Sequence, residues 1–530
     1  MKGVRTAEEV SQDLRRAAGA PVEALPEGGE WIRLEGDPAS ARRVKSLLVD
    51  LNNFSTFPTL AIGLLVAALR NAGQEAEVLS PLAHDVPAAE RERRERRWDD
   101  WARRLHLSQD PRLTAVRDAA RGARTWWRER PHPRTLRAVA EALDRGPEVV
   151  LLSAYLQHRR TVEAIGRLAE ARGIPVLLGG PAFNLPQTSE AWRGVTGVQA
   201  IVGAEVDRSL PELVRTLVEG GDLLQFPGVV LPDGTRSAVA APLKRLDDTP
   251  VPDFTDFPWD RYRTRVIPVM TGRGCQWAEC VFCSDVHTAG MRSFRTRSVE
   301  SVLHELEEQA RRHQTRNFLF LDLKLNSSPA LLRGLVAGIQ RRVPGAQWIG
   351  TVHVDGREDN GLSRSELRAA VAAGMRRVSF GLESGSQRML DAMRKGSTVE
   401  GNSRFIRDSH AAGLSVRCTI FRGFPGETAD DLHQTAAFLE AHEAQLDRVR
   451  FNDLSIHEGT AMHSALEADP QAYPGLRVRG PEAARAKLRY SSSIGRKGEE
   501  RAALDRVLRV VHAINRRPVR SAARAFDGLM

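Results

Sequence analysis

Cysteine is scarce in this chain, with four residues in 530. So few thiols favour a cytosolic protein. Long apolar runs are also missing, and none approaches the ~20 residues that a membrane-spanning helix needs. Residues 1–16 are charged and have no apolar core, so we expect no secretory signal there.

The rest of the composition is ordinary for a soluble globular protein, with 42% hydrophobic and 27% charged residues. The length predicts about two or three domains. The net charge of +10 and the pI of 9.9 would suit nucleic-acid binding. Much of this charge, however, is arginine in helical segments beside glutamate, which is more typical of a solvated face. Nucleic acid is therefore not the expected partner.

Three of the four cysteines, Cys275, Cys280 and Cys283, follow a Gly-Arg-Gly run with the spacing C-x4-C-x2-C. Thiolates so placed suit three corners of a cubane iron–sulfur cluster. The fourth cysteine, Cys418, is far away in sequence, so the fourth iron would stay open for a substrate. A zinc site is one alternative, with His287 as the nearby fourth ligand. Inert buried thiols are the other alternative, and Cys418 itself is predicted to be a core residue.

The N-terminal half alternates short apolar strands with amphipathic helices. Strands are predicted at residues 46–50, 149–153, 174–180 and 199–203, and helices at residues 58–72, 161–172 and 209–219. This order predicts a parallel, doubly wound α/β sheet. Ligands of such sheets bind at the carboxyl ends of the strands.

Those strand ends carry small and polar residues: Asn52, Asn53, Ser153, Gly179, Gly180, Pro181, Gly203 and Glu205. Glycine at a strand end lets the backbone approach a bulky ligand. Ordinary tight turns would explain the same residues equally well.

A second βα series begins at residue 265. Its strands are predicted at residues 266–270, 317–322, 347–351, 377–383, 415–421 and 448–454, and its helices at residues 299–312, 329–342, 363–373, 399–412 and 429–442. Six βα units predict an open barrel whose chemistry lies at the carboxyl ends of the strands. The cysteine loop follows the first strand and therefore lies on that face.

The domain organisation predicted from these patterns is an extension at residues 1–42, the sheet domain at 43–246, a connector at 247–264, the barrel at 265–466 and a basic, helical region at 467–530. An insert at residues 84–145 mixes Glu, Arg and Trp. We interpret it as a salt-bridged solvent face with the tryptophans packed down. Arginine with interleaved aromatics could instead bind single-stranded nucleic acid. The C-terminal region is predicted to be a packed helical cap.

The cysteine loop, with Phe282 before its last cysteine, resembles that of radical S-adenosylmethionine (SAM) enzymes, although their usual first gap is one residue shorter. Three later strand ends resemble the loops by which that family contacts SAM: residues 321–326, 381–386 and 423–428. The sheet domain resembles the cobalamin-binding domain that precedes many radical SAM domains. The resemblance covers about residues 43–466.

This resemblance implies a set of site residues. Cys275, Cys280 and Cys283 would hold a [4Fe–4S] cluster. SAM would be contacted by Phe282, Asp322, Lys324, Glu383, Ser384, Ser386, Gly426 and Glu427. Cobalamin would be contacted by Asn52, Ser153, Gly179, Gly180, Pro181, Gly203 and Glu205. The sequence Asp-x-His-x-x-Gly is missing at the first strand end, so we expect no axial histidine from that loop; surface or packing roles are expected for His84 and His158.

Arg422 departs from the family, which usually carries an apolar residue there. It could clamp a substrate carboxylate or pair with Glu427. The chain also lacks the additional cysteines that the resemblance would require of enzymes with auxiliary clusters and of methylthiotransferases.

The resemblance implies a cytoplasmic radical SAM enzyme. The leading hypothesis is a cobalamin-dependent C-methyltransferase that acts on an unactivated carbon of a secondary metabolite or modified peptide, with flavodoxin or ferredoxin as electron donor. Cobalamin-dependent ring contraction or cyclisation without methyl transfer is one alternative. A basic, non-catalytic iron–sulfur protein that binds nucleic acid is the other.

Overall fold

The computed structural model describes residues 42–54, 56–88, 92, 94–108, 110, 112–285, 294–493 and 498–529. The zinc alternative through His287 and nearly all of the extension at 1–42 lie outside these residues. Residues 43–530 form one compact unit. In the described part of the chain, no helix is both long and apolar enough to cross a membrane.

The first sheet has six strands in the order β2-β1-β3-β4-β5-β6, and only the last pair is antiparallel. The strands are β1 (Lys45–Val49), β2 (Glu75–Leu79), β3 (Val149–Ser153), β4 (Val176–Gly179), β5 (Val198–Val202) and β6 (Val229–Val230). The four central strands read as nearly continuous apolar runs because both faces of the sheet are covered. This confirms the predicted doubly wound fold. The edge strands β2 and β6 were not predicted, because one is rich in glutamate and the other is only two residues long.

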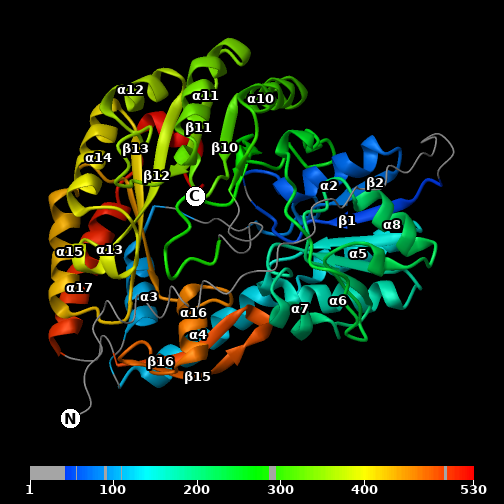
Figure 1. Cartoon of the computed structure of the whole chain (residues 1–530), viewed down its shortest axis with the longest axis horizontal. Helices are drawn as coiled ribbons and strands as arrows, with labels where there is room; N and C mark the ends of the chain where they lie inside the picture. Colours follow the sequence, from blue (N-terminus) through cyan, green and yellow to red (C-terminus); the bar gives the residue numbers. More distant parts are fainter. Residues whose placement is uncertain are drawn as a thin grey trace, which may run out of the picture. The chain divides into compact units, whose positions relative to one another are not determined.

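Helices cover this sheet on both sides (Figure 1). One face packs against α2 (Leu60–Asn71) and α8 (Leu210–Val218), and the other against α5 (Pro133–Leu143), α6 (Arg159–Glu170) and α7 (Pro186–Trp192). The helix α5 lies within the predicted insert but packs as part of the sheet domain. The side chains of β1 show the division, since Leu48 points into one core and Leu47 into the other.

The second sheet is an open barrel wall of six parallel strands in the order β14-β13-β12-β11-β10-β7, as predicted. Its strands are β7 (Ile267–Val269), β10 (Asn317–Phe320), β11 (Gln347–Val352), β12 (Met375–Glu383), β13 (Ser415–Arg422) and β14 (Arg448–Asp453). The intervening helices are α10 (Val299–His313), α11 (Pro329–Arg342), α12 (Arg364–Ala372), α14 (Val399–Ala412) and α15 (Ala429–Ala441). The short helix α13 (Gln387–Ala392) was not predicted.

Each of these five barrel helices begins at a Ser or Thr whose hydroxyl accepts a backbone N–H of the first turn. Ser363 and Thr428 complete capping boxes with Glu366 and Asp431. The capping residue that begins each helix can be recognised in the local sequence, and the predicted and observed helix starts therefore agree to within a residue.

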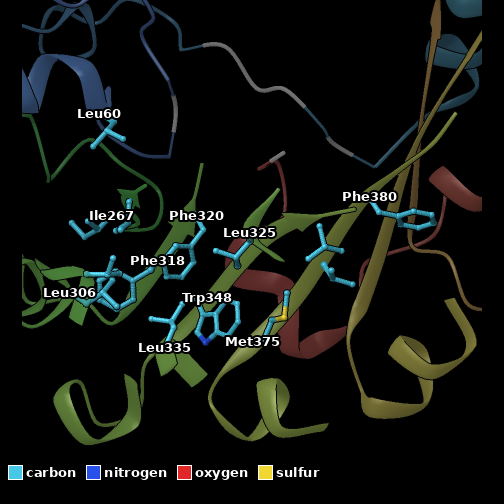
Figure 2. Packing of buried hydrophobic residues seen from close by; sticks show 14 of the residues in the cluster. Leu60, Ile267, Leu306, Phe318, Phe320, Leu325, Leu335, Trp348, Met375 and Phe380 are labelled. Atoms are coloured by element: carbon cyan, nitrogen blue, oxygen red, sulfur yellow. The ribbon is translucent and has the colours of Figure 1, made fainter. Parts of the chain in front are cut away.

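The barrel core consists mainly of aliphatic side chains, with the aromatic rings of Phe318, Phe320, Trp348 and Phe380 among them (Figure 2). Phe320 meets Trp348 edge to face, with ring centroids 5.5 Å apart. The indole N–H of Trp348 donates to the carbonyl of Ala373 at 2.9 Å, so this large polar aromatic is buried with its hydrogen bond satisfied. Cys418 is also fully buried in β13, which confirms its predicted core role.

The C-terminal region contains the predicted helix, α17 (Gly498–Asn515), after α16 (Ala461–Ala468). It also contains an unpredicted hairpin, β15 (Leu476–Glu482) and β16 (Lys487–Ser492). The hairpin turn reaches the first domain, where the indole N–H of Trp192 donates to the carbonyl of Ala484 at 2.9 Å. Asn515 exchanges two hydrogen bonds of 2.8 Å with the backbone of Val449 and so covers the edge strand β14.

The insert adds α3 (Arg97–Leu107) and α4 (Thr114–Glu129). Its ion pairs form as predicted, for example between Arg103 and Glu95. The expectation that its tryptophans pack down is wrong, since Trp98, Trp101, Trp126 and Trp127 are 53–68% exposed. In α4, Arg117 and Arg121 turn inward in place of Trp126 and Trp127, whereas Trp98 and Trp101 of α3 stack on each other with ring centroids 4.8 Å apart. Arg117 donates to the carbonyl of Ser108, and Arg121 donates to Asp453.

Candidate functional site

The cysteine loop leaves the barrel after β7 through a narrow two-stranded stem, β8 (Gly272–Arg273) paired antiparallel with β9 (Arg295–Thr296). Asp322, at the end of β10, holds the start of this stem. Its carboxylate accepts the Thr271 hydroxyl at 2.6 Å and the Gly272 amide at 2.9 Å. Burial raises the pKa of Asp322 to about 6, against the lowering effect of these hydrogen bonds. The SAM contact of Asp322 remains a prediction. In the structure, Asp322 anchors the start of the cysteine loop through these hydrogen bonds.

The loop itself is seated on the segment after α13. The amide of Val281 donates to the carbonyl of Met393 at 3.2 Å, and the indole of Trp277 donates to the carbonyl of Arg394 at 2.9 Å. Gly396 adopts a positive φ of 69°, and a Cβ there would lie 2.2 Å from the Trp277 ring. This glycine is therefore required for the loop to dock. Sequence reasoning missed Trp277, although a tryptophan inside a cysteine motif is a usable signal.

All three motif cysteines are half-buried and carry free thiols. Burial raises the pKa of Cys280 and raises that of Cys283 to about 12, while the ammonium group of Lys395 opposes both shifts. Lys395 is held by Glu383, with 2.8 Å between Nζ and Oε1. Sequence reasoning predicted Glu383 but missed Lys395.

The donor set of this loop suits an iron–sulfur cluster. Three soft thiols lie in one short loop whose stem and centre are both anchored, and a buried cation stands beside them. Among the described residues, no three Cys, His, Asp or Glu side chains are gathered as a metal-ion site. The fit therefore rests on donor chemistry and on the anchoring of the loop.

A second buried ion pair lies at the ends of β10 and β11. The ammonium of Lys324 is 2.6 Å from the Asp355 carboxylate, and both side chains are almost fully buried. Arg357 adds a hydrogen bond of 3.0 Å to the same carboxylate. His353 contacts the carbonyl of Lys395 at 2.9 Å, which connects this cluster to the segment on which the cysteine loop is seated. Of these residues only Lys324 was predicted. The signal for the others was polar sequence directly after the third barrel strand.

The serine hydroxyls of the fourth-strand loop make hydrogen-bond contacts with side chains of the protein itself. Ser384 lies 3.2 Å from the Thr435 hydroxyl, and Ser386 donates to Asp431 at 2.6 Å, so both hold the loop against α15. Glu383 has a positive φ of 60°, which is costly for a non-glycine residue and is common at ligand-binding turns. The SAM contacts expected of the two serines remain predictions.

The fifth-strand loop differs from one expectation. Arg422 does not pair with Glu427; it donates to Asp453 at 2.9 Å and to the carbonyl of Leu107 in α3. Glu427 accepts the Gly423 amide at 2.7 Å instead, and burial raises its pKa to about 7. Gly426 has a positive φ of 80°. Phe282 of the cysteine loop packs on Phe421, with ring centroids 4.8 Å apart.

The glycines at the edge of the first sheet are required by close backbone packing. A Cβ on Gly180 would lie 2.2 Å from the carbonyl oxygen of Ala154, and one on Gly203 would lie 2.2 Å from that of Phe183. The contact is looser at Gly179, where the nearest atom would be 3.5 Å away. The ordinary structural explanation thus accounts for Gly180 and Gly203 whether or not a ligand binds.

The other residues of that edge divide into two groups. Asn52, Ser153 and Pro181 are half-buried or exposed there, and Oδ1 of the neighbouring Asn53 is a buried acceptor with no hydrogen-bond partner among the described residues. Such an orphaned acceptor fits a ligand that carries amide donors. Both carboxylate oxygens of Glu205 are bound by Arg295, at 2.8 and 2.9 Å, and the cobalamin contact expected of Glu205 remains a prediction. His158 accepts the Tyr155 amide at 3.3 Å, in agreement with the packing role expected of it.

Comparison with known proteins adds three findings. A model of the radical SAM superfamily matches residues 269–439. An uncharacterised methyltransferase of Pyrococcus horikoshii, PH0819, is 27% identical over 327 residues, which cover 60% of this chain and 68% of that protein.

Two solved structures share the fold. One is OxsB, a cobalamin-dependent SAM radical enzyme, with a TM-score of 0.64 and 17% identity over 87% of this chain and 66% of the other. The second is TsrM of Kitasatospora setae, a radical SAM methyltransferase with cobalamin and a [4Fe–4S] cluster bound. Its TM-score is 0.59 and its identity 19%, over 88% of this chain and 89% of the other. At such identities these structures establish the fold alone.

Proposed function

We propose that this chain is a cobalamin-dependent C-methyltransferase, because a radical SAM superfamily model matches residues 269–439 and the fold is shared with two cobalamin-dependent radical SAM enzymes. Its substrate would carry the methyl group on an unactivated carbon, in a secondary metabolite or a modified peptide. The observation that carries the proposal is a contact. Arg295, in the stem of the cysteine loop, binds Glu205 beyond the carboxyl end of β5, and this contact supports a shared site for the two proposed cofactors.

Within the barrel, Cys275, Cys280 and Cys283 would hold the [4Fe–4S] cluster of a radical SAM domain. Such a cluster, with SAM bound, supplies a 5′-deoxyadenosyl radical that takes hydrogen from carbon. The protein's part is positional. Asp322 fixes the base of the loop, and Trp277 fixes its centre. Phe282 and Phe421 contribute an apolar wall that excludes water.

At the first sheet, Asn52, Ser153, Gly179, Gly180, Pro181 and Gly203 would hold cobalamin, which supplies a transferable methyl group. The unpartnered acceptor of Asn53 supports this placement, because the corrin periphery carries amide donors. An electron donor such as flavodoxin or ferredoxin completes the proposal.

The first test is the bound cofactor content of protein made anaerobically with cobalamin supplied. We expect about one corrinoid and about four irons per chain. Cys283→Ser should lose iron and SAM cleavage, whereas the matched control Cys418→Ser, in the core of β13, should retain both. Iron without corrinoid would overturn the cobalamin assignment.

The reaction class needs a second readout, with candidate substrates present. Methyl transfer produces S-adenosylhomocysteine together with 5′-deoxyadenosine. Ring contraction or cyclisation would yield 5′-deoxyadenosine alone, and that outcome would contradict the methyltransferase proposal while leaving the radical SAM assignment intact.

A further inference from the structure

The stem of the cysteine loop carries an arginine on each of its two strands. Arg273 enters the loop and Arg295 leaves it, and the two are paired directly across the antiparallel ribbon. Every residue of the cysteine motif lies between them. Whatever holds these two side chains therefore holds both ends of the loop.

Both arginines are bound by acids of the other domain. Arg273 contacts the two carboxylate oxygens of Asp207 at 2.7 and 2.8 Å. Arg295 binds Glu205 in the same bidentate way, and Arg273 also lies 3.4 Å from Glu205. The four side chains are only 8–15% exposed. Paired, bidentate and shielded from water, these contacts fix orientation as well as distance.

The acids themselves stand on a rigid base. They follow β5, and the Gly203 amide donates to the carbonyl of Gly228 at 2.8 Å, just before them. No Cβ fits at Gly203. Glu205 also accepts the amide of Leu243 at 2.8 Å, while Arg295 donates to the carbonyl of Leu243 at 2.7 Å. The acids are thus placed by contacts within the sheet domain itself, through Gly228 and Leu243.

We propose that Glu205 and Asp207 are positioning residues for the cysteine loop, acting through Arg295 and Arg273. The sheet domain then does more than present its own ligand: it sets the position of the loop that carries the cluster ligands. This assignment concerns the loop alone and holds whether or not the sheet binds cobalamin. Together with Asp322, which holds Thr271 from the barrel side, the acids leave the stem gripped from two directions.

The test compares Asp207→Asn and Glu205→Gln, which remove charge but keep shape, with Glu212→Gln as a matched control. Glu212 lies on the next helix, α8, and pairs with Arg215 at 2.8 Å, away from the loop. Amide hydrogen exchange is measured on the protein without cluster, in peptides covering residues 270–274 and 294–298. We expect exchange roughly tenfold faster in the two acid variants and unchanged in the control.

A second readout separates positioning from general stability. In reconstituted protein, the electron paramagnetic resonance spectrum of the reduced cluster should broaden in Asp207→Asn, and its shift on adding SAM should weaken, while Asp207→Glu restores part of the shift. Unchanged exchange and an unchanged spectrum in both acid variants would overturn the proposal. If Asp207→Asn fails to fold, the milder Arg295→Lys, which keeps charge but loses the bidentate grip, is judged by the same two readouts.

Discussion

Among single residues, Glu427 illustrates how burial sets protonation. Its carboxyl is buried behind the fifth barrel strand, and its pKa rises from 4.5 to about 7 because the charged form is poorly solvated there. The folded protein therefore keeps a proton that the unfolded chain has lost between those pH values. The contribution of Glu427 to the free energy of unfolding is fully present below pH 4.5 and is lost as the pH rises through about 7.

Glu427→Gln removes this titration while preserving an acceptor for the Gly423 amide. We expect the variant to melt at a higher temperature than the parent above pH 7, with an advantage of at most about 3 kcal/mol that shrinks towards pH 4.5. Thermal melts of the cluster-free protein at several pH values measure this. Glu163→Gln, in a surface pair on α6, is the control. A pH-independent difference between Glu427→Gln and the parent would contradict the assigned cause.

At the scale of elements, the site depends on α13 and the segment after it, which form the seat of the cysteine loop. Backbone carbonyls of this seat accept hydrogen bonds from the Val281 amide and the Trp277 indole of the loop. Because Gly396 has no Cβ, the Trp277 ring can pack directly against it. A loop that must present three thiols needs such external support, because its described residues 274–285 form almost no regular structure.

Gly396→Ala tests the seat. The new Cβ would clash with Trp277, and the backbone there has a positive φ that alanine adopts only at a cost of about 1 kcal/mol or more. We expect lower iron content after reconstitution, with secondary structure retained. Gly122→Ala on α4 is the control, because nothing lies within 4 Å of its added Cβ. Parental iron content in Gly396→Ala would show that the loop does not need this seat.

For the molecule as a whole, Asp453 connects the insert to the barrel. It stands at the end of β14 and pairs with Arg422 of β13 and with Arg121 of α4, while Arg422 also reaches α3 through the carbonyl of Leu107. Three parts of the chain thus converge on one carboxylate at the barrel rim. The same cluster occupies Arg422, which the sequence had offered as a substrate clamp.

Asp453→Ala should release the insert from the barrel, since it leaves two arginines without their shared acid. We expect faster amide exchange in residues 97–107 and 114–129, with little change in α10. Glu163→Ala, which breaks one half-buried pair on α6, should leave the insert unaffected. Equal protection of α3 and α4 in Asp453→Ala and in the parent would show that the ion pairs are dispensable for docking.

The sequence by itself determined the two parallel sheets, the barrel helices and the face that carries the cysteine loop. Those features depend on local patterns: apolar strand runs, Ser and Thr caps, and glycine after strands. It also indicated Cys275, Cys280 and Cys283, because ligand spacing within one loop is a local property.

Only the tertiary structure decided which partner each charged side chain takes. Glu205 binds Arg295, ninety positions along the chain, and Arg422 reaches Leu107 across 315 positions. The exposed tryptophans of α4 follow the same rule, since the inward arginines found acceptors in distant segments. Such ion pairs form where separate parts of the chain pack together, and local sequence periodicity does not predict that packing.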